Sequence, residues 1–344
     1  MDAGCYTALV TPFTPEGGLD TQGLDRLINY QVKSGITGIL AVGTTGESPT
    51  LKWEEHNQVI AHVAAAAKDQ CLCIAGTGSN NTQEALYGAA HAQKAGADAV
   101  LLVDPYYNGP SSLEIRKEYI EPIAEALPDL TIIPYIIPGR TGAQLLPEDL
   151  AILAETHKNV TTVKEATGNL DNMKRTRFCC PQGFTILSGD DGLTFEMMTD
   201  PDIRAAGVIS VISNLIPKAL TDMTALLNRG ETEEADKIQT AITPLMGLVT
   251  ITTMEETPFG PVTCRARNPL AIKTLMQILG MPSGHCRQPI GKMTEKGLAK
   301  VLEITRTVQK NNPEILQPIA DFFDIDIQER LTEPRLRENL TYGY

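Results

Sequence analysis

The chain has 344 residues, of which 42% are hydrophobic and 21% charged, and its formal net charge is -13. This composition is typical of a globular protein with one large domain or two ordinary ones. An acidic chain without a basic stripe argues against nucleic acid and anionic membrane surfaces as partners. No apolar run approaches the roughly 20 residues that span a bilayer, and no secretory signal is recognisable, so we expect a cytoplasmic protein.

The seven cysteines are odd in number, and no pair of CxxC motifs occurs among them. This pattern favours reduced thiols over a disulfide framework. His56 and His62 are six residues apart and therefore do not share a helix face as a metal-binding pair would. We expect no structural metal.

Short apolar runs alternate with longer amphipathic segments over the first two thirds of the chain. The runs have the length and residue types of buried parallel strands. The eight predicted strands are 7–13, 38–43, 72–78, 99–105, 132–138, 160–167, 184–191 and 205–214.

The amphipathic segments between these strands have helical spacing. Helices are predicted at 21–34, 53–67, 82–95, 112–127, 147–156 and 193–199. Eight β/α units of this size predict an α/β fold, a (β/α)8 TIM barrel spanning residues 1–226. A doubly wound sheet is the competing fold, but its usual glycine fingerprint is missing after the first strand.

The alternation stops near residue 226. Helical patterns at 231–250, 268–279 and 294–311, separated by Pro/Gly-rich stretches at 257–261 and 280–284, predict a C-terminal helical domain at 227–312. Residues 313–344 form an extra C-terminal extension that contains Phe322 and Phe323. We expect these rings to dock the extension on the helical appendage or on a neighbouring subunit.

Lys164 lies within the predicted strand 160–167, VTTVKEAT, where the other residue types indicate burial. Desolvation lowers the pKa of a lysine toward the neutral amine, which can attack a ketone to form a Schiff base. In the alternative interpretation, Lys164 lies where the strand leaves the core and extends its amine to solvent.

Other polar groups follow the carboxyl ends of the strands, where barrel enzymes carry their chemistry. GTTGES at 43–48 is either an anion site built from backbone N–H groups and hydroxyls or a capping turn. Tyr135 and Arg140 belong to the fifth unit, and Arg140 is either a carboxylate clamp or a surface ion-pair partner. One face of the barrel would then carry four groups that a Schiff-base aldolase acting on a 2-oxo acid needs: a lysine, a phenol, an anion site and an arginine.

The ordered motifs GTTGES, DPYYN, Y-x-x-P-x-R-T-G, KEATG, SGDD and GVISV resemble the dihydrodipicolinate synthase / N-acetylneuraminate lyase family, particularly its synthase branch. The resemblance runs from Cys5 to about Met293. It implies condensation of pyruvate with L-aspartate-4-semialdehyde to 4-hydroxy-tetrahydrodipicolinate, the first committed step of lysine (diaminopimelate) biosynthesis. It also implies no cofactor beyond the Schiff base on Lys164, and a homo-oligomer, dimer or tetramer.

The resemblance also assigns roles to residues of this chain. It implies that Lys164 forms the imine and that Tyr135, Thr44 and Tyr107 relay protons, with Tyr107 supplied by a neighbouring subunit. The positions that it assigns to substrate binding are Thr45, Arg140, Ile209 and Gly189.

Many synthases of this family are inhibited by L-lysine in a cleft between two subunits, and the resemblance implies the same cleft here. The matching positions are Ser48, Pro49, Trp53, His56, Asn80, Glu84 and Tyr106. In the alternative interpretation, these side chains only cap helices and fill a dimer interface.

The family commonly has Asn where this chain has Ile136. Strand alternation predicts that Ile136 faces away from Tyr135, so we expect repacking behind the site. Two other functions stay open: a sister aldolase (N-acetylneuraminate lyase or 2-keto-3-deoxy-sugar-acid aldolase), and a non-catalytic sensor of a 2-oxo acid or amino acid.

Overall fold

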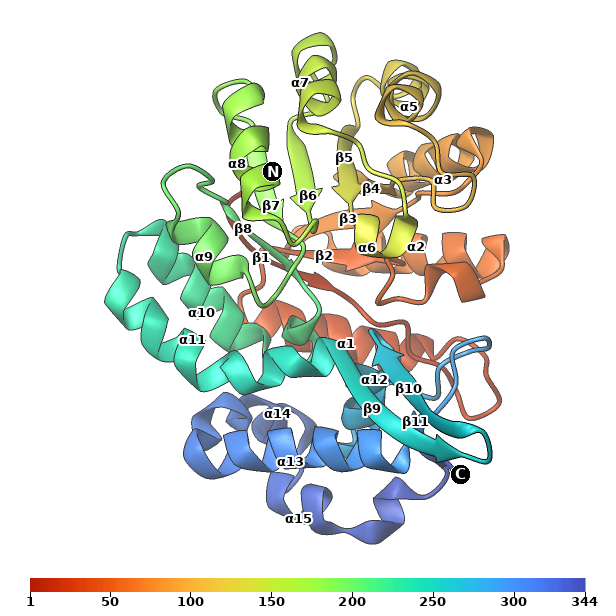
Figure 1. The fold of residues 1–344 in the computed structure, drawn as a ribbon, viewed down its shortest axis with the longest axis vertical. Coiled ribbons are helices and arrows are strands. Elements are labelled where there is room, and N and C mark those ends of the chain that lie inside the picture. The colour runs from red at the N-terminus through yellow and green to blue at the C-terminus, as the bar shows by residue number, and fades with distance from the viewer. Residues whose placement is uncertain (344) are drawn as a thin grey trace.

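The computed structural model describes residues 1–343, and Tyr344, the last residue of the predicted extension, lies outside them. Eight parallel strands close into a barrel in chain order, which confirms the predicted fold (Figure 1). Each predicted strand is found, although β1 begins three residues before its predicted start and all eight strands end earlier than predicted. The strands are β1 (Gly4–Ala8), β2 (Gly38–Ala41), β3 (Leu72–Gly76), β4 (Ala99–Val103), β5 (Thr131–Ile136), β6 (Thr162–Glu165), β7 (Thr185–Ser188) and β8 (Gly207–Ser210).

Helices cover the outside of the barrel and connect successive strands. The segment predicted as one helix at 112–127 is divided by a π-helical stretch, Ile115–Ile120. The helices are α1 (Thr21–Lys33), α2 (Trp53–Ala67), α3 (Thr82–Ala95), α4 (Ser112–Glu114), α5 (Glu121–Ala126), α6 (Pro138–Thr141), α7 (Pro147–Thr156), α8 (Leu170–Cys179), α9 (Thr194–Thr199) and α10 (Pro217–Asn228).

The sequence analysis missed three of these helices: α6, which has only four residues, α8 and α10. In α8 only Met173 and Thr176 are buried, so its sequence has almost no apolar periodicity. In α10 the buried residues Leu220 and Met223 follow closely on another apolar segment, which hides where the helix begins.

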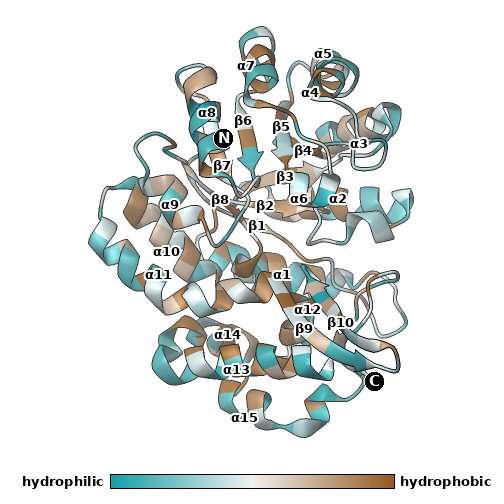
Figure 2. Ribbon diagram, in the orientation of Figure 1, coloured by the Kyte–Doolittle hydropathy of each residue, from teal (hydrophilic) through white to brown (hydrophobic). Residues whose placement is uncertain are grey.

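Alternation along the strands divides the apolar residues into an inner and an outer core. Tyr135 belongs to the small cluster inside the barrel. Its neighbour Ile136 belongs to the large cluster between the strands and the surrounding helices, as predicted. Figure 2 shows hydrophobic residues along the strands and on the inward faces of the helices around them.

The C-terminal part is not purely helical, which corrects the prediction. Between α11 (Thr232–Met246) and α12 (Leu270–Ile278) lies an antiparallel hairpin of β9 (Thr250–Thr257) and β10 (Gly260–Arg267). Buried Ile251, Thr253 and Glu255 alternate with exposed residues along β9. This pattern was missed because two of the three inward residues are polar. The long helix α13 (Glu295–Asn311) packs beside the hairpin (Figure 1).

The C-terminal extension packs on both parts of the molecule. In α14 (Gln317–Phe323), the rings of Phe322 and Phe323 lie 5.1 and 5.3 Å from that of Tyr30 on α1. Contact with a helix of the barrel was not predicted. Arg330 in α15 (Ile327–Thr332) donates to the carbonyl of Ile278 in α12 at 2.6 Å, so the extension also docks on the appendage, as expected.

Candidate active site

Lys164 lies in the middle of β6 with only 4% of its surface exposed. Burial lowers the pKa of its amine from 10.5 to about 7, and the nearby charge of Arg140 acts in the same direction. The carboxyl group of Asp191 opposes this shift. A substantial fraction of the amine is therefore neutral, and nucleophilic, near pH 7. The burial agrees with the first interpretation of this residue.

Tyr135 lies beside Lys164 on the adjacent strand, because the register of β5 and β6 pairs the two residues. The Lys164 Nζ lies 4.3 Å from the centre of the Tyr135 ring. The phenol is hydrogen-bonded to the side chain of Thr44, and burial raises its pKa to about 12. A protonated phenol therefore lies beside a neutral amine and is linked to a second hydroxyl.

Thr44 and Thr45 belong to the turn at residues 43–48, which follows β2 and is closed by backbone bonds from Glu47 to Thr44 and from Ser48 to Gly43. Thr45 is 2% exposed. The turn presents hydroxyls, one bonded to Tyr135, at the carboxyl end of the barrel. The anion-site interpretation needs hydroxyls in this position. The helix that was expected to begin at the turn is only a short 3-10 helix, Ser48–Thr50.

Arg140 projects from the short helix α6, directly after β5. Its side chain is exposed, although partial desolvation of the guanidinium lowers its pKa, and one Nη donates to the carbonyl of Asn268 at 3.4 Å. No carboxylate forms an ion pair with Arg140 among residues 1–343. This cation is therefore available to an anionic ligand.

Gly189 and Ile209 complete the surroundings of the amine. A Cβ at Gly189 would lie 3.0 Å from the Lys164 Cε and 3.1 Å from its Cγ, so a side chain there would displace the lysine. Ile209 in β8 is 1% exposed and belongs to the inner cluster. Asp191 is buried and accepts hydrogen bonds from Ser210 and from the backbone N–H of Val211 at 2.9 Å.

A cavity of about 460 Å³ opens at the carboxyl ends of the strands and is lined by Thr44, Tyr135 and Arg140. The same cavity contains all seven positions of the predicted lysine cleft: Ser48, Pro49, Trp53, His56, Asn80, Glu84 and Tyr106. In a single chain, the two predicted sites are therefore parts of one continuous space.

Within this cleft, several side chains are already held by neighbours. The Glu84 carboxylate accepts from Ser79 at 2.6 Å, and Asn80 accepts from the backbone N–H of Tyr106 at 2.7 Å. The rings of Trp53 and His56 lie 5.1 Å apart. Burial lowers the pKa of His56 to about 4, so this imidazole is neutral at physiological pH.

Tyr107 is the one predicted catalytic residue that the chain does not bring into the site. Its side chain is 85% exposed, and it does not line the cavity. The exposed ring is available to a second copy of the chain, and its role in the site of that copy stays a prediction.

Asn268 was missed by the sequence analysis, which assigned it only to a helical pattern. Its side chain donates to the Thr45 hydroxyl at 2.9 Å, and its carbonyl accepts from Arg140. The one available signal was the Asn268-Pro269 dipeptide, which typically marks a turn. Among residues 1–343, no group of three His, Cys, Asp or Glu side chains is arranged to hold a metal, and no helix is long and apolar enough to cross a membrane.

Comparison with known proteins gives a consistent result. The Dihydrodipicolinate synthetase family model matches residues 1–308. The 4-hydroxy-tetrahydrodipicolinate synthase of Methanococcus maripaludis is 38% identical over 298 residues, which cover 87% of this chain and 96% of the relative.

Two solved structures have the same architecture. A dihydrodipicolinate synthase of Cyanidioschyzon merolae with lysine bound has a TM-score of 0.80 and 33% identity, covering 89% of this chain and 98% of its own. A chloride-inhibited dihydrodipicolinate synthase of Acinetobacter baumannii complexed with pyruvate has a TM-score of 0.81 and 32% identity, covering 90% and 99%. The chain belongs to the dihydrodipicolinate synthetase family.

Proposed function

We propose that this chain condenses pyruvate with L-aspartate-4-semialdehyde to 4-hydroxy-tetrahydrodipicolinate through a Schiff base on Lys164. The observation that carries the proposal is the buried Lys164 amine, with a pKa of about 7, against the ring of Tyr135. A lysine without a catalytic role would not be kept at a desolvated strand position without an ion-pair partner.

In the proposed reaction, the neutral Lys164 amine attacks C2 of pyruvate to give a carbinolamine, which loses water to form an iminium. Loss of a methyl proton gives the enamine, whose carbon attacks the aldehyde of the second substrate. Transimination by the amino group of that substrate closes the ring and releases Lys164.

Tyr135 is suited to move protons during these steps, because its raised pKa keeps it protonated and its hydrogen bond to Thr44 gives the proton a path away. We assign the pyruvate carboxylate to the turn at 43–48 and the carboxylate of the second substrate to Arg140. The guanidinium of Arg140 lines the cavity and has no ion-pair partner among residues 1–343, which favours this synthase over sister aldolases that act on sugar acids.

Two further parts of the proposal concern assembly and inhibition. The exposed Tyr107 supports a homo-oligomer in which a second copy completes the proton relay. The cleft from Ser48 to Tyr106, together with the lysine-bound relative, supports L-lysine as an inhibitor.

Borohydride trapping tests the Schiff base directly. Reduction in the presence of pyruvate should add one mass increment per chain, and peptide mapping should locate it on Lys164. The matched control is Lys174, a partly exposed lysine on α8 that pairs with Asp200. Lys174→Ala should still be trapped, whereas Lys164→Ala should not. An adduct elsewhere, or none in the wild type, would rule out this mechanism.

A further inference from the structure

The turn at 43–48 is held from outside at three consecutive residues. Asn268 donates to the Thr45 hydroxyl at 2.9 Å, and the Thr11 hydroxyl donates to the Gly46 carbonyl at 2.7 Å. The Glu47 carboxylate accepts from Lys273 at 2.6 Å. Asn268 and Lys273 follow their partners by 223 and 226 residues, so the C-terminal part of the chain determines the position of this turn.

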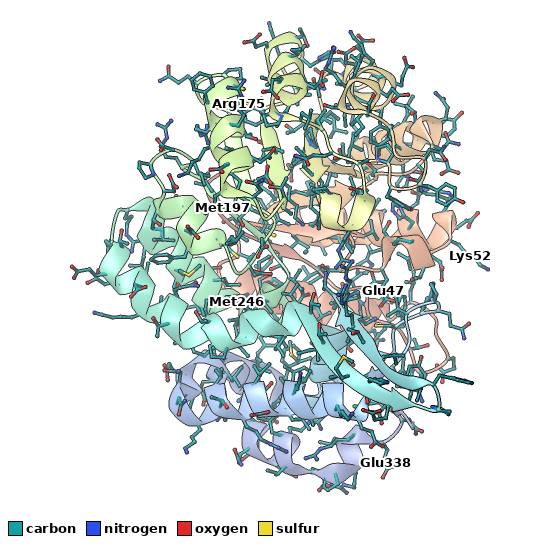
Figure 3. The ribbon with its side chains drawn as sticks, in the orientation of Figure 1. Glu47, Lys52, Arg175, Met197, Met246 and Glu338 are labelled. Carbon is teal, nitrogen blue, oxygen red and sulfur yellow. The ribbon has the colours of Figure 1, made fainter. Side chains whose placement is uncertain are left out.

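Glu47 and Lys273 form a fully buried ion pair, with 0% and 1% of their side chains exposed. The Lys273 amine also donates to the Thr11 carbonyl at 3.0 Å, and the second Glu47 oxygen accepts from the backbone N–H of Arg287 at 2.8 Å. Figure 3 shows Glu47 between the barrel and the C-terminal part. Both charges are therefore satisfied by several partners, which a stable buried pair requires.

The backbone of Glu47 is itself unusual. Its φ of 58° lies in the left-handed region, which a non-glycine residue adopts only when its surroundings enforce it. The contacts of its carboxylate supply that enforcement. Because Glu47 donates its N–H to the Thr44 carbonyl, its conformation is coupled to Thr44.

Asn268 acts on the hydroxyl of Thr45. A hydroxyl has one hydrogen to donate, and when its oxygen accepts a bond from a neighbour, that hydrogen is directed elsewhere. The N–H of Asn268 therefore leaves the Thr45 hydrogen free for another acceptor beside the turn. The carbonyl of Asn268 accepts from Arg140, so this residue contacts both groups to which substrate carboxylates are assigned.

We propose that Asn268 and the Glu47–Lys273 pair are positioning residues that hold the turn at 43–48 in its carboxylate-binding shape and thereby set the affinity for pyruvate. They do so without touching the substrate. This inference rests on the proposed function, and it concerns the 2-oxo acid that forms the Schiff base.

Asn268→Asp is a nearly isosteric test. The new carboxylate accepts the Thr45 hydrogen and adds a negative charge beside the anion site, so the pyruvate concentration for half-maximal borohydride trapping should rise at least tenfold. The carbonyl that contacts Arg140 is unchanged, so the KM for aspartate semialdehyde and the kcat at saturating pyruvate should stay within about twofold of wild type.

The ion pair needs a double variant, because removing one partner would leave a buried charge and strongly destabilise the fold. Glu47→Gln/Lys273→Met removes both charges at similar volume. It should fold and raise the half-maximal pyruvate concentration about tenfold. The control is Arg116→Met/Glu121→Gln, which removes an ion pair away from the cavity and also the contact of Arg116 with Asp149. It should lower the melting temperature without changing that concentration.

The outcomes separate this inference from the proposed function. If the wild type is not trapped at all, the proposed function fails. If the wild type is trapped and Asn268→Asp has an unchanged pyruvate dependence, the inference is overturned whatever the melting temperatures. An unchanged dependence in the folded double variant removes the ion pair from the positioning role.

Discussion

The Lys164 amine lies 4.3 Å from the centre of the Tyr135 ring, and the two residues are directly paired across β5 and β6. This relationship places the amine at the face of an aromatic ring inside the barrel, where water cannot solvate its charged form. The same wall of the barrel therefore supplies both the proton carrier and the low pKa of the nucleophile.

The pH dependence of the reaction should reflect the Lys164 amine. Because its pKa is about 7, kcat/KM for pyruvate should rise with pH through this value as the amine becomes neutral. Asp191 raises the pKa of Lys164, so Asp191→Asn should move the rising limb to lower pH. Asp202→Asn, an exposed change, serves as control. If the pH at which kcat/KM rises is the same in Asp191→Asn as in Asp202→Asn and the wild type, a group other than Lys164 controls the pH dependence.

Two buried lysines should respond oppositely to the same substitution. Lys164 has a pKa below its unfolded value of 10.5, so its burial destabilises the fold fully below about pH 7, and the penalty disappears as pH rises toward 10.5. Lys164→Met should therefore stabilise the protein by up to a few kcal/mol at pH 6, and by less at pH 10.

Lys273→Met should instead destabilise by about 3–5 kcal/mol, because it leaves Glu47 charged and buried. Thermal melts of both variants at pH 6 and pH 10 measure the difference. A stabilising Lys273→Met would mean that the buried ion pair does not contribute to stability.

Arg140→Ala should affect the second substrate selectively. Losing a charged hydrogen-bond donor costs about 1.5–3 kcal/mol, or roughly a ten- to hundredfold rise in the KM for aspartate semialdehyde. Trapping with pyruvate alone should change little. Similar losses in both steps would assign Arg140 to the scaffold or to the pyruvate carboxylate.

The barrel was predictable from the sequence because each buried strand is a short apolar run, and Lys164 is conspicuous within one. Ile136 could be assigned to the outer core from alternation alone. The hairpin β9–β10 was not predictable, since its buried Thr253 and Glu255 are polar types. The roles of Asn268 and Lys273 were not predicted for another reason. Their partners, Thr45 and Glu47, lie more than 220 residues away in the sequence, and no local pattern encodes such contacts.

The extension should contribute to stability through the aromatic cluster on α1. Phe323 is 6% exposed and lies against Tyr30, with the guanidinium of Arg26 5.2 Å from its ring centre. Phe323→Ala should cost about 3 kcal/mol or more. Phe178 is 80% exposed, so Phe178→Ala should change stability by less than about 0.5 kcal/mol. Turnover should be unaffected in both, and an unchanged melting point for Phe323→Ala would mean that the extension is dispensable.

Inhibition by L-lysine should depend on the charge of Glu84. The carboxylate lines the cavity and is oriented by the Ser79 hydroxyl, so one oxygen stays available to an ammonium group, while the Trp53 ring offers a face for the aliphatic stem. Glu84→Gln keeps the shape and removes the charge, and should raise the lysine concentration for half-inhibition at least tenfold with unchanged kcat. Glu118→Gln, exposed on the neighbouring π-helical segment, is the control. Equal inhibition of the wild type, Glu84→Gln and Glu118→Gln would exclude Glu84 from the lysine site. If millimolar lysine does not inhibit the wild type, the regulatory role is wrong, and the catalytic role is unaffected.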